Sequence, residues 1–493
     1  MKLAVSSFLL FLILAPATAQ NNNSHNPSWW NKYQYLLNHP ADSAAGPGSS
    51  LSVGANIDVS NECGPQSETF IAIDPGHSSI LAAGSNEIFR DPMRGYFSTD
   101  NGLSWGGVDL PLPTPIGNGT RFGSDPTLVF DTQGNAFYGY VLVFFGNGKG
   151  INGTEMAVAK SVDGGATYPN VTFFAFNGGS DHFNDKPMIT ADANPSSPFR
   201  DNVYLSWDSA SGGSATGGGV HVATSTDHGA TFTVVRADDP SGPGGSIGAV
   251  PFVGPDGTVY AAWNDIVANV IAFARSADGG ATWQRPSIIS SKNAGLDVGI
   301  PAESFRRALV YPACAADRST GQHRGRLYCS WMDVTAAGTT DIFLAFSDDK
   351  GNTWSSPATV ADRLGFPVDR FNQWLAVDPV TGDVNVSFYD TRNDTTGFRF
   401  MTDTFFTQSK DGGHIFISPN IRVTTVSSNE HDCNGLFPCP GIDLGNQQGD
   451  YEGLASFGGV SHAIWTDSRR QLDPATGCRT NLTMEEVFTA VVK

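Results

Sequence analysis

Ser276-Ala-Asp278-Gly-Gly280-Ala-Thr282-Trp283 is one of six copies of a pattern that decides the fold of this 493-residue chain. In a hairpin turn, the short Asp side chain accepts hydrogen bonds from turn amides, and Gly supplies the positive φ of the bend. We call these segments the Ser-Asp-Gly turns and interpret their Asp residues as structural. The other five copies are Ser98-Thr-Asp100-Asn-Gly102-Leu-Ser104-Trp105, Ser161-Val-Asp163-Gly-Gly165-Ala-Thr167-Tyr168, Ser225-Thr-Asp227-His-Gly229-Ala-Thr231-Phe232, Ser347-Asp-Asp349-Lys-Gly351-Asn-Thr353-Trp354 and Ser409-Lys-Asp411-Gly-Gly413-His-Ile-Phe416.

The spacing of the turns indicates a ring of repeated units. Successive first Ser residues lie between 51 (276−225) and 71 (347−276) residues apart, and hairpins repeated at this spacing are typical of a propeller. Short runs rich in Val, Ile, Phe, Tyr and Thr repeat a four-strand cycle around each turn. The first cycle begins near Glu68, and the later inner strands are expected near Asp125, Asp185, Ala249, Ala308, Trp374 and Leu454.

The seventh cycle runs out of chain before its fourth strand. We expect residues 50–59 to supply that strand, which would close the ring and pair its exposed sheet edges. The sequence therefore predicts an all-β propeller of four-stranded antiparallel blades, with seven blades preferred and six as the alternative.

The Ser-Asp-Gly turns resemble the Asp-box, or bacterial neuraminidase repeat, of the sialidase superfamily. The resemblance covers the chain from about Leu51 to its end. It implies the propeller fold strongly and the reaction only weakly, because one scaffold can serve many chemistries. Most sialidases of this superfamily have six blades, which is why six is retained as the alternative.

The N-terminus has the layout of a cleaved secretory signal. Lys2 precedes an apolar run, residues 3–14, and the small residues 17–19 form a cleavage site. The run is shorter than the roughly 20 apolar residues of a membrane span. We expect a signal peptide over 1–19, a leader over 20–50 and a propeller domain over 51–493, in a secreted extracellular protein without a membrane span.

Six cysteines in a secreted chain suggest three disulfides. Cys314 and Cys329 flank a polar turn between two strand-like runs and could pair across a hairpin. Two further pairs are then expected, Cys433 with Cys439 and Cys63 with Cys478, the last of which would latch the first strand region to the last.

The formal charge of −19 argues against nucleic acid and anionic membranes as partners. We expect an extracellular glycan or glycoconjugate as the partner, and a monomeric protein. An axial ring of carboxylates could hold Ca²⁺, although no dedicated calcium loop is present and no cofactor is required. Glycosylation is expected at Asn-x-Ser/Thr sequons, which begin at Asn22, Asn118, Asn152, Asn170, Asn385, Asn393 and Asn481.

Ionisable residues gather in the loops opposite the Ser-Asp-Gly turns. These loops lead into each inner strand or join the second strand to the third, and we call their side of the ring the loop face. Inner strands arranged around one axis would bring these loops to a common cleft. A polar trio, residues 450–452, opens the last inner strand, and His182 could be a proton shuttle or a plain surface histidine.

The resemblance to sialidases implies a Tyr nucleophile activated by Glu, an Asp acid/base, and arginines that hold a substrate carboxylate. Set against this pattern, Tyr451 would be the nucleophile. Glu303 or Glu452 would be its activating base, and Asp125 or Asp185 would be the acid/base. Arg307 and Arg370 could be the carboxylate clamps of this pattern. Arg121, Arg392 and Arg469, which lie in the same group of loops, are further substrate-binding candidates, and we expect no catalytic metal. The chain departs from the pattern on its first inner strand, Glu68-Thr-Phe70-Ile, where sialidases carry an Arg.

Three functions remain open. The first is a sialidase-like glycoside hydrolase that removes terminal, acidic sugars from extracellular glycans. The second is a polysaccharide lyase that acts next to a uronate on the same scaffold. The third is a non-catalytic propeller that binds glycans or proteins.

Overall fold

The computed structural model describes residues 50–60, 65–88, 90–146, 151–179, 182–211, 218–242, 244–284, 286–303, 307–431, 448–469 and 485–493. In these ranges, every element of regular secondary structure is a β-strand. A search of the same ranges finds no helix of the length and apolarity that crossing a membrane requires.

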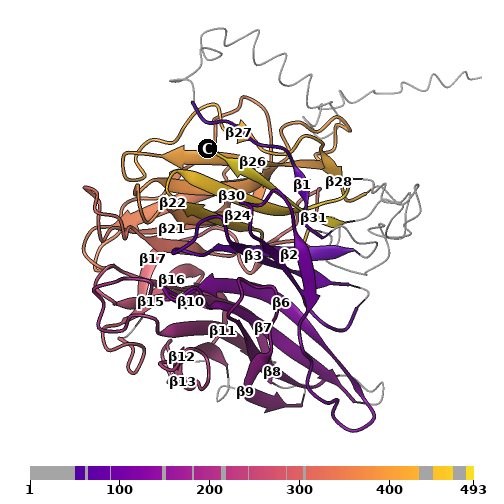
Figure 1. Ribbon diagram of the computed structural model, residues 1–493. Helices are drawn as coiled ribbons and strands as arrows, with labels where there is room; N and C mark the ends of the chain where they lie inside the picture. Colours follow the sequence, from indigo (N-terminus) through magenta and orange to yellow (C-terminus); the bar gives the residue numbers. More distant parts are fainter. Residues whose placement is uncertain are drawn as a thin grey trace, which may run out of the picture.

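Seven four-stranded antiparallel sheets form the blades of a propeller. They follow one another around a ring, and in Figure 1 the strands of the first blade lie between those of the second and the seventh. The first three blades consist of β2 (Gln66–Ile73), β3 (Leu81–Glu87), β4 (Arg94–Ser98) and β5 (Gly106–Asp109); β6 (Thr120–Phe130), β7 (Ala136–Phe145), β8 (Ile151–Ser161) and β9 (Asn170–Gly178); and β10 (His182–Ala191), β11 (Val203–Ser211), β12 (Gly219–Ser225) and β13 (Thr233–Arg236).

The remaining blades repeat the same order from inner to outer strand. They consist of β14 (Ser246–Val253), β15 (Val259–Asp265), β16 (Val270–Ser276) and β17 (Ser287–Ser291); β20 (Ala313–Ala316), β21 (Leu327–Val334), β22 (Thr340–Ser347) and β23 (Ala358–Thr359); β24 (Arg370–Val377), β25 (Val384–Asp390), β26 (Met401–Ser409) and β27 (Ile421–Arg422); and β29 (Gly453–Phe457), β30 (Val460–Asp467), β31 (Glu486–Val492) and β1 (Ile57–Asp58). In addition, β28 (Ser428–Asn429) pairs with β26.

The N-terminal strand β1 completes the seventh blade. Ile57 pairs with Thr489 and Asp58 with Phe488 in antiparallel register, and Val53 bridges Val492. In Figure 1 the indigo β1 lies beside the yellow β31. The predicted ring closure is confirmed, and the count of seven blades is confirmed over six.

The fifth inner strand begins later than the sequence suggested. Ala308 lies in β19 (Ala308–Leu309), which pairs with β18 (Asp297–Val298) outside the blade. The inner strand β20 starts at Ala313, directly after Pro312. Because proline has no amide hydrogen to donate to a ladder, it separates the two short strands.

Aromatic residues at one position of the second strands fill the space between blades. Trp207, Trp263 and Trp331 are the fifth residues of β11, β15 and β21. Trp465 is the sixth residue of β30, and all four tryptophans are at most 2 % exposed. Successive side chains of a strand point to opposite faces, so each tryptophan packs against a neighbouring blade. Burial of such side chains is the main stabilising contribution of the ring.

The six Ser-Asp-Gly turns share one hydrogen-bond pattern. In the fourth, Gly280 N donates to Ser276 Oγ at 2.9 Å, and Thr282 N donates to Asp278 Oδ1 at 2.9 Å. These contacts lower the pKa of Asp278 to about 2, led by the hydrogen bond from the Thr282 hydroxyl. The Gly of every turn has positive φ, as predicted, at Gly102, Gly165, Gly229, Gly280, Gly351 and Gly413.

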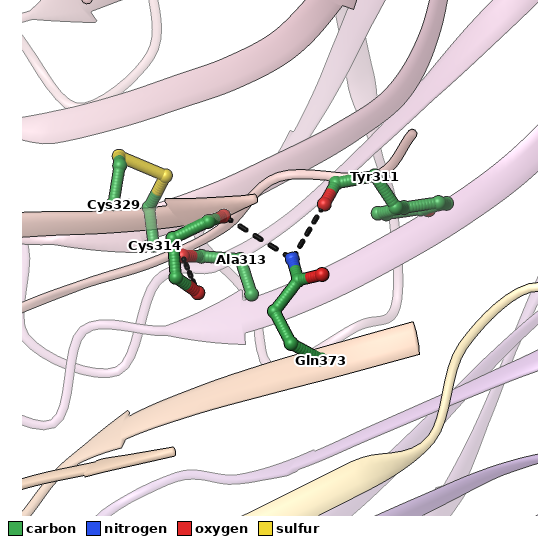
Figure 2. The surroundings of a disulfide bond; sticks show 6 residues. Tyr311, Ala313, Cys314, Cys329 and Gln373 are labelled. Carbon is green, nitrogen blue, oxygen red and sulfur yellow. Dashed lines mark hydrogen bonds between the residues drawn. A yellow bond between two sulfur atoms is a disulfide. The ribbon is translucent and has the colours of Figure 1, made fainter. Parts of the chain in front are cut away.

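The predicted disulfide between Cys314 and Cys329 is confirmed. The two residues are direct partners across β20 and β21, with Cα atoms 4.1 Å apart. Beside it, Gln373 Nε2 from the sixth blade donates to the Tyr311 carbonyl at 2.7 Å, as Figure 2 shows, and so links two blades. The other predicted pairs, which involve Cys63, Cys433, Cys439 and Cys478, lie outside the described residues, as does the signal segment.

Candidate active site

The inner strands place their side chains at the ring centre through a repeated β-bulge. Five of them shift register against the second strand, and bulges of this kind re-aim side chains near functional sites. One residue at each bulge adopts positive φ, which is uncommon for residues other than glycine. These residues are Glu68 (52°), Asp125 (61°), Lys186 (51°), Gly248 (73°) and Asn372 (47°).

Three of these bulges meet a fourth loop in a buried ion network. Lys186 Nζ lies 2.9 Å from Glu68 Oε1, 3.5 Å from Asp125 Oδ1 and 2.6 Å from Asp450 Oδ2. Burial alone would lower the pKa of Lys186, but the carboxylates of Asp125, Asp450 and Glu68 outweigh it and hold the pKa well above its ordinary value. The one ammonium group of Lys186 therefore forms ion pairs with three carboxylates.

Asp185 and Asp125 form a pair whose pKa values are shifted in opposite directions. Burial, followed by the nearby charge of Asp125, raises the pKa of Asp185 well above its ordinary value. Burial would also raise the pKa of Asp125, but the Lys186 ammonium and hydrogen bonds, one from Ser124 Oγ at 2.8 Å, keep that pKa below its ordinary value. Carboxyl pairs whose pKa values are pushed apart mark acid and base assignments.

The pair faces a pocket on the loop face, which we call the axial pocket. Its volume is about 470 Å³, within the range of ordinary ligand sites. Asp185 is partly exposed, so its proton can be reached from this space. The polar side chains that line the pocket are those of Ser124, Asp125, Asp185, Lys186, Ser246, Asp297, Arg307 and Asp450.

Tyr451 lies near this network without lining the axial pocket. It is 1 % exposed, and its hydroxyl donates to the Pro126 carbonyl at 3.0 Å. Its ring packs against Phe70, Tyr311 and Trp374, with centroids 5.7 to 6.4 Å away. Tyr451 thus helps to plug the ring centre, and burial raises the pKa of its hydroxyl well above the ordinary value.

Glu303 and Glu452 belong to a second group of buried carboxyls, together with Glu430 and Glu485. All four are at most 1 % exposed, and none lines the axial pocket. Burial raises the pKa of Glu430 to about 8 and that of Glu452 well above its ordinary value. The structure therefore separates these two predicted catalytic residues from Asp125 and Asp185.

Of the five predicted arginines, only Arg307 lines the axial pocket. Its side chain is half exposed, and its Nε donates to Asp297 Oδ1 at 2.8 Å. Arg370 and Arg392 both bind the buried Asp390 carboxylate, with shortest contacts of 2.8 and 2.6 Å.

The other two predicted arginines are also paired. The Asp467 carboxylate accepts the Nε hydrogen of Arg469 at 2.8 Å. Arg121 donates to the Pro113 carbonyl at 2.7 Å and lies 3.9 Å from the Asp91 carboxylate. Four arginines therefore hold the loops of the propeller together.

Glu68, Lys186 and Asp450 are site residues to which the sequence interpretation gave no catalytic or binding role, although Asp450 belongs to the polar trio noted there. Glu68, Asp125 and Lys186 occupy one equivalent position of their inner strands. Each lies at the bulge, two residues before the residue at which regular pairing with the second strand resumes. Aligning the repeats on the inner strand rather than on the Ser-Asp-Gly turn would have grouped them. Their contacts also join residues as far apart as Glu68 and Asp450, whose backbone amide donates to Glu68 Oε1.

Several solved structures resemble this chain. A leech intramolecular trans-sialidase is 14 % identical, with 74 % of this chain and 70 % of that chain covered and a TM-score of 0.46. The NanB sialidase of Streptococcus pneumoniae is 10 % identical, with 72 % and 69 % covered and a TM-score of 0.43. A Dyadobacter fermentans protein of unknown function is 11 % identical, with 91 % and 100 % covered and a TM-score of 0.43.

No family model matches the chain, and no curated protein matches it. The fold and the site define a seven-bladed β-propeller with an acid-lined axial pocket. The function proposed below rests on that pocket.

Proposed function

We propose that the protein is a glycoside hydrolase whose reaction takes place in the axial pocket. The observation that carries the proposal is that the Asp185 and Asp125 carboxyls line one cavity large enough for a sugar, with their pKa values shifted in opposite directions. Glycosidases need one carboxylic acid to protonate the leaving oxygen and one carboxylate to assist attack at the sugar.

Each residue of the pocket has a part in this mechanism. Asp185 gives its proton to the glycosidic oxygen as the bond to the sugar breaks. Asp450 is the ionised carboxylate that takes a proton from the attacking water or stabilises the positive charge of the sugar. Asp125 keeps the proton on Asp185 through its own negative charge, and Lys186 holds Asp125 and Asp450 in place.

The nature of the sugar follows from the charges of the pocket. Binding of an acidic sugar, as expected from the resemblance, would rely on Arg307, because Arg370, Arg392 and Arg469 are engaged with buried carboxylates. Among the described residues, four aspartates and two cationic side chains line the pocket. This balance favours a cationic transition state and a sugar without a carboxylate. Secretion, and with it an extracellular substrate, remains part of the proposal on the grounds of the N-terminal sequence.

A glycan panel with wild-type protein and Asp185→Asn tests the proposal. We expect wild type to release sugar and the variant, which cannot donate the proton, to lose at least about a hundredfold in kcat. Glu452→Gln is the matched control because Glu452 is a buried carboxyl outside the pocket. Absorbance from an unsaturated uronate would replace the hydrolase with a lyase, and binding without turnover would favour a non-catalytic propeller.

A further inference from the structure

The axial pocket continues into a smaller pocket on each side. One flanking pocket, of about 420 Å³, lies between the first and second blades and includes Ile88 and Phe122. The other, of about 380 Å³, lies by the third and fourth blades and includes Trp263 and Val267. Ser124 borders the axial pocket and the first flanking pocket, and Ser246 borders the axial pocket and the second. The three pockets therefore adjoin one another across the loop face, and we call them together the groove.

The groove combines apolar and acidic surfaces. Val267 is 68 % exposed and Leu296 is 40 % exposed, and both line the groove. Exposed apolar side chains beside polar groups suit sugar rings, which present C–H faces and hydroxyl edges. In the part of the chain that the structure describes, nine carboxyl side chains and three cationic side chains line the three pockets together. An acidic groove repels a carboxylated or sulfated chain.

We infer that the groove binds an uncharged or amino-bearing glycan chain along its length, with the Asp185 site in its interior. This inference rests on the proposed function and extends it from a terminal sugar to internal bonds of a chain. A chain that occupies both flanking pockets places its scissile bond at the axial pocket, so the products would be oligosaccharides instead of single terminal sugars.

Binding to the inactive Asp185→Asn protein tests the inference without turnover. The probes are hexasaccharides and disaccharides of the gluco, manno, xylo and N-acetylglucosamine series, a glucosamine hexasaccharide and a galacturonate hexasaccharide. We expect an uncharged or amino hexasaccharide to bind at least about tenfold more tightly than its disaccharide, because it reaches the flanking pockets.

Filling a flanking pocket should remove this dependence on length. Ala268 is exposed and lines the second flanking pocket, so Ala268→Trp should weaken hexasaccharide binding about tenfold and leave disaccharide binding unchanged. Ile88→Trp should likewise weaken hexasaccharide binding by filling the first flanking pocket, and should leave disaccharide binding unchanged. Val380→Trp is the control, since Val380 is 54 % exposed and lies outside the groove.

The outcomes separate this inference from the proposed function. Equal affinity for hexasaccharides and disaccharides, tightest binding of the galacturonate chain, or binding of no hexasaccharide would overturn the inference. Hydrolysis by wild type together with any of these results would leave the hydrolase standing. Binding that depends on chain length, without hydrolysis by wild type, would support the groove and reject the hydrolase.

Discussion

At the scale of single residues, Tyr451 shows how burial constrains chemistry. Its hydroxyl donates a hydrogen bond to the Pro126 carbonyl, and its ring packs among aromatic neighbours. We expect Tyr451→Phe to lower the free energy of unfolding by about 1–3 kcal/mol, because a buried carbonyl loses its donor. Hydrolysis should stay close to wild type. Denaturant unfolding and the glycan assay measure both effects, and a well-folded variant without activity would restore Tyr451 as the nucleophile.

Glu430 makes stability depend on pH. Burial raises its pKa to about 8 from the ordinary 4.5, so the folded protein keeps a proton that the unfolded chain has lost between these values. Its contribution to stability is complete below about pH 4.5 and is lost as the pH rises through 8. Urea unfolding at pH 5, 7 and 8 should show this decline, and Glu430→Gln should reduce its slope. An unchanged slope would show that Glu430 does not titrate in this way.

At the scale of elements, the disulfide joins two strands within the fifth blade, and the hydrogen bonds of Gln373 join that blade to the sixth. The bond between Cys314 and Cys329 closes a sequence separation of 15 residues. Replacing both cysteines by alanine should lower the free energy of unfolding by about 3 kcal/mol, since the unfolded chain regains entropy. Differential scanning calorimetry checks this value. Reduction of the wild-type protein should lower its free energy of unfolding by the same amount, and the variant should not respond to reductant. Both results together would assign the effect to this bond.

The elements were predictable because their signals are local. Each Ser-Asp-Gly turn contains its own donors, acceptors and glycine within eight residues, so the sequence predicted the turns and the repeat correctly. The fifth inner strand was misplaced at Ala308 because two short β-runs lie on either side of Pro312. Asp125 and Asp185 were selected by their position at strand starts. Lys186 and Glu68 were given no role, because the two residues of this ion pair lie 118 positions apart in the sequence and meet only when the ring forms.

At the scale of the whole molecule, the ring depends on its N-terminal strand. β1 supplies the outer strand of the seventh blade, with hydrogen bonds such as Val59 N to Val487 O at 2.7 Å. Removing residues 1–60 should expose the edge of β31 and cause loss of stability or aggregation. Removing residues 1–49 is the control and should leave the melting temperature unchanged. Equal melting temperatures for the two truncations would contradict closure by β1.

Burial also limits one surface modification. Asn385 is 1 % exposed, and its side-chain oxygen accepts a hydrogen bond from Gln408 Nε2 at 2.9 Å. A glycan on this sequon would not fit the folded blade. Asn118 and Asn170 are exposed, so they remain suitable sequons in the described part of the chain.

The most direct test of the proton-donating role of Asp185 is the pH profile of kcat/KM for wild type and Asp125→Asn. Because Asp125 adds negative charge beside Asp185, its removal should lower the pKa of Asp185 and move the alkaline limb to lower pH by about one unit or more. Glu452→Gln, outside the pocket, should leave the limb in place. An alkaline limb that does not move in Asp125→Asn would contradict the assignment of Asp185 as the acid.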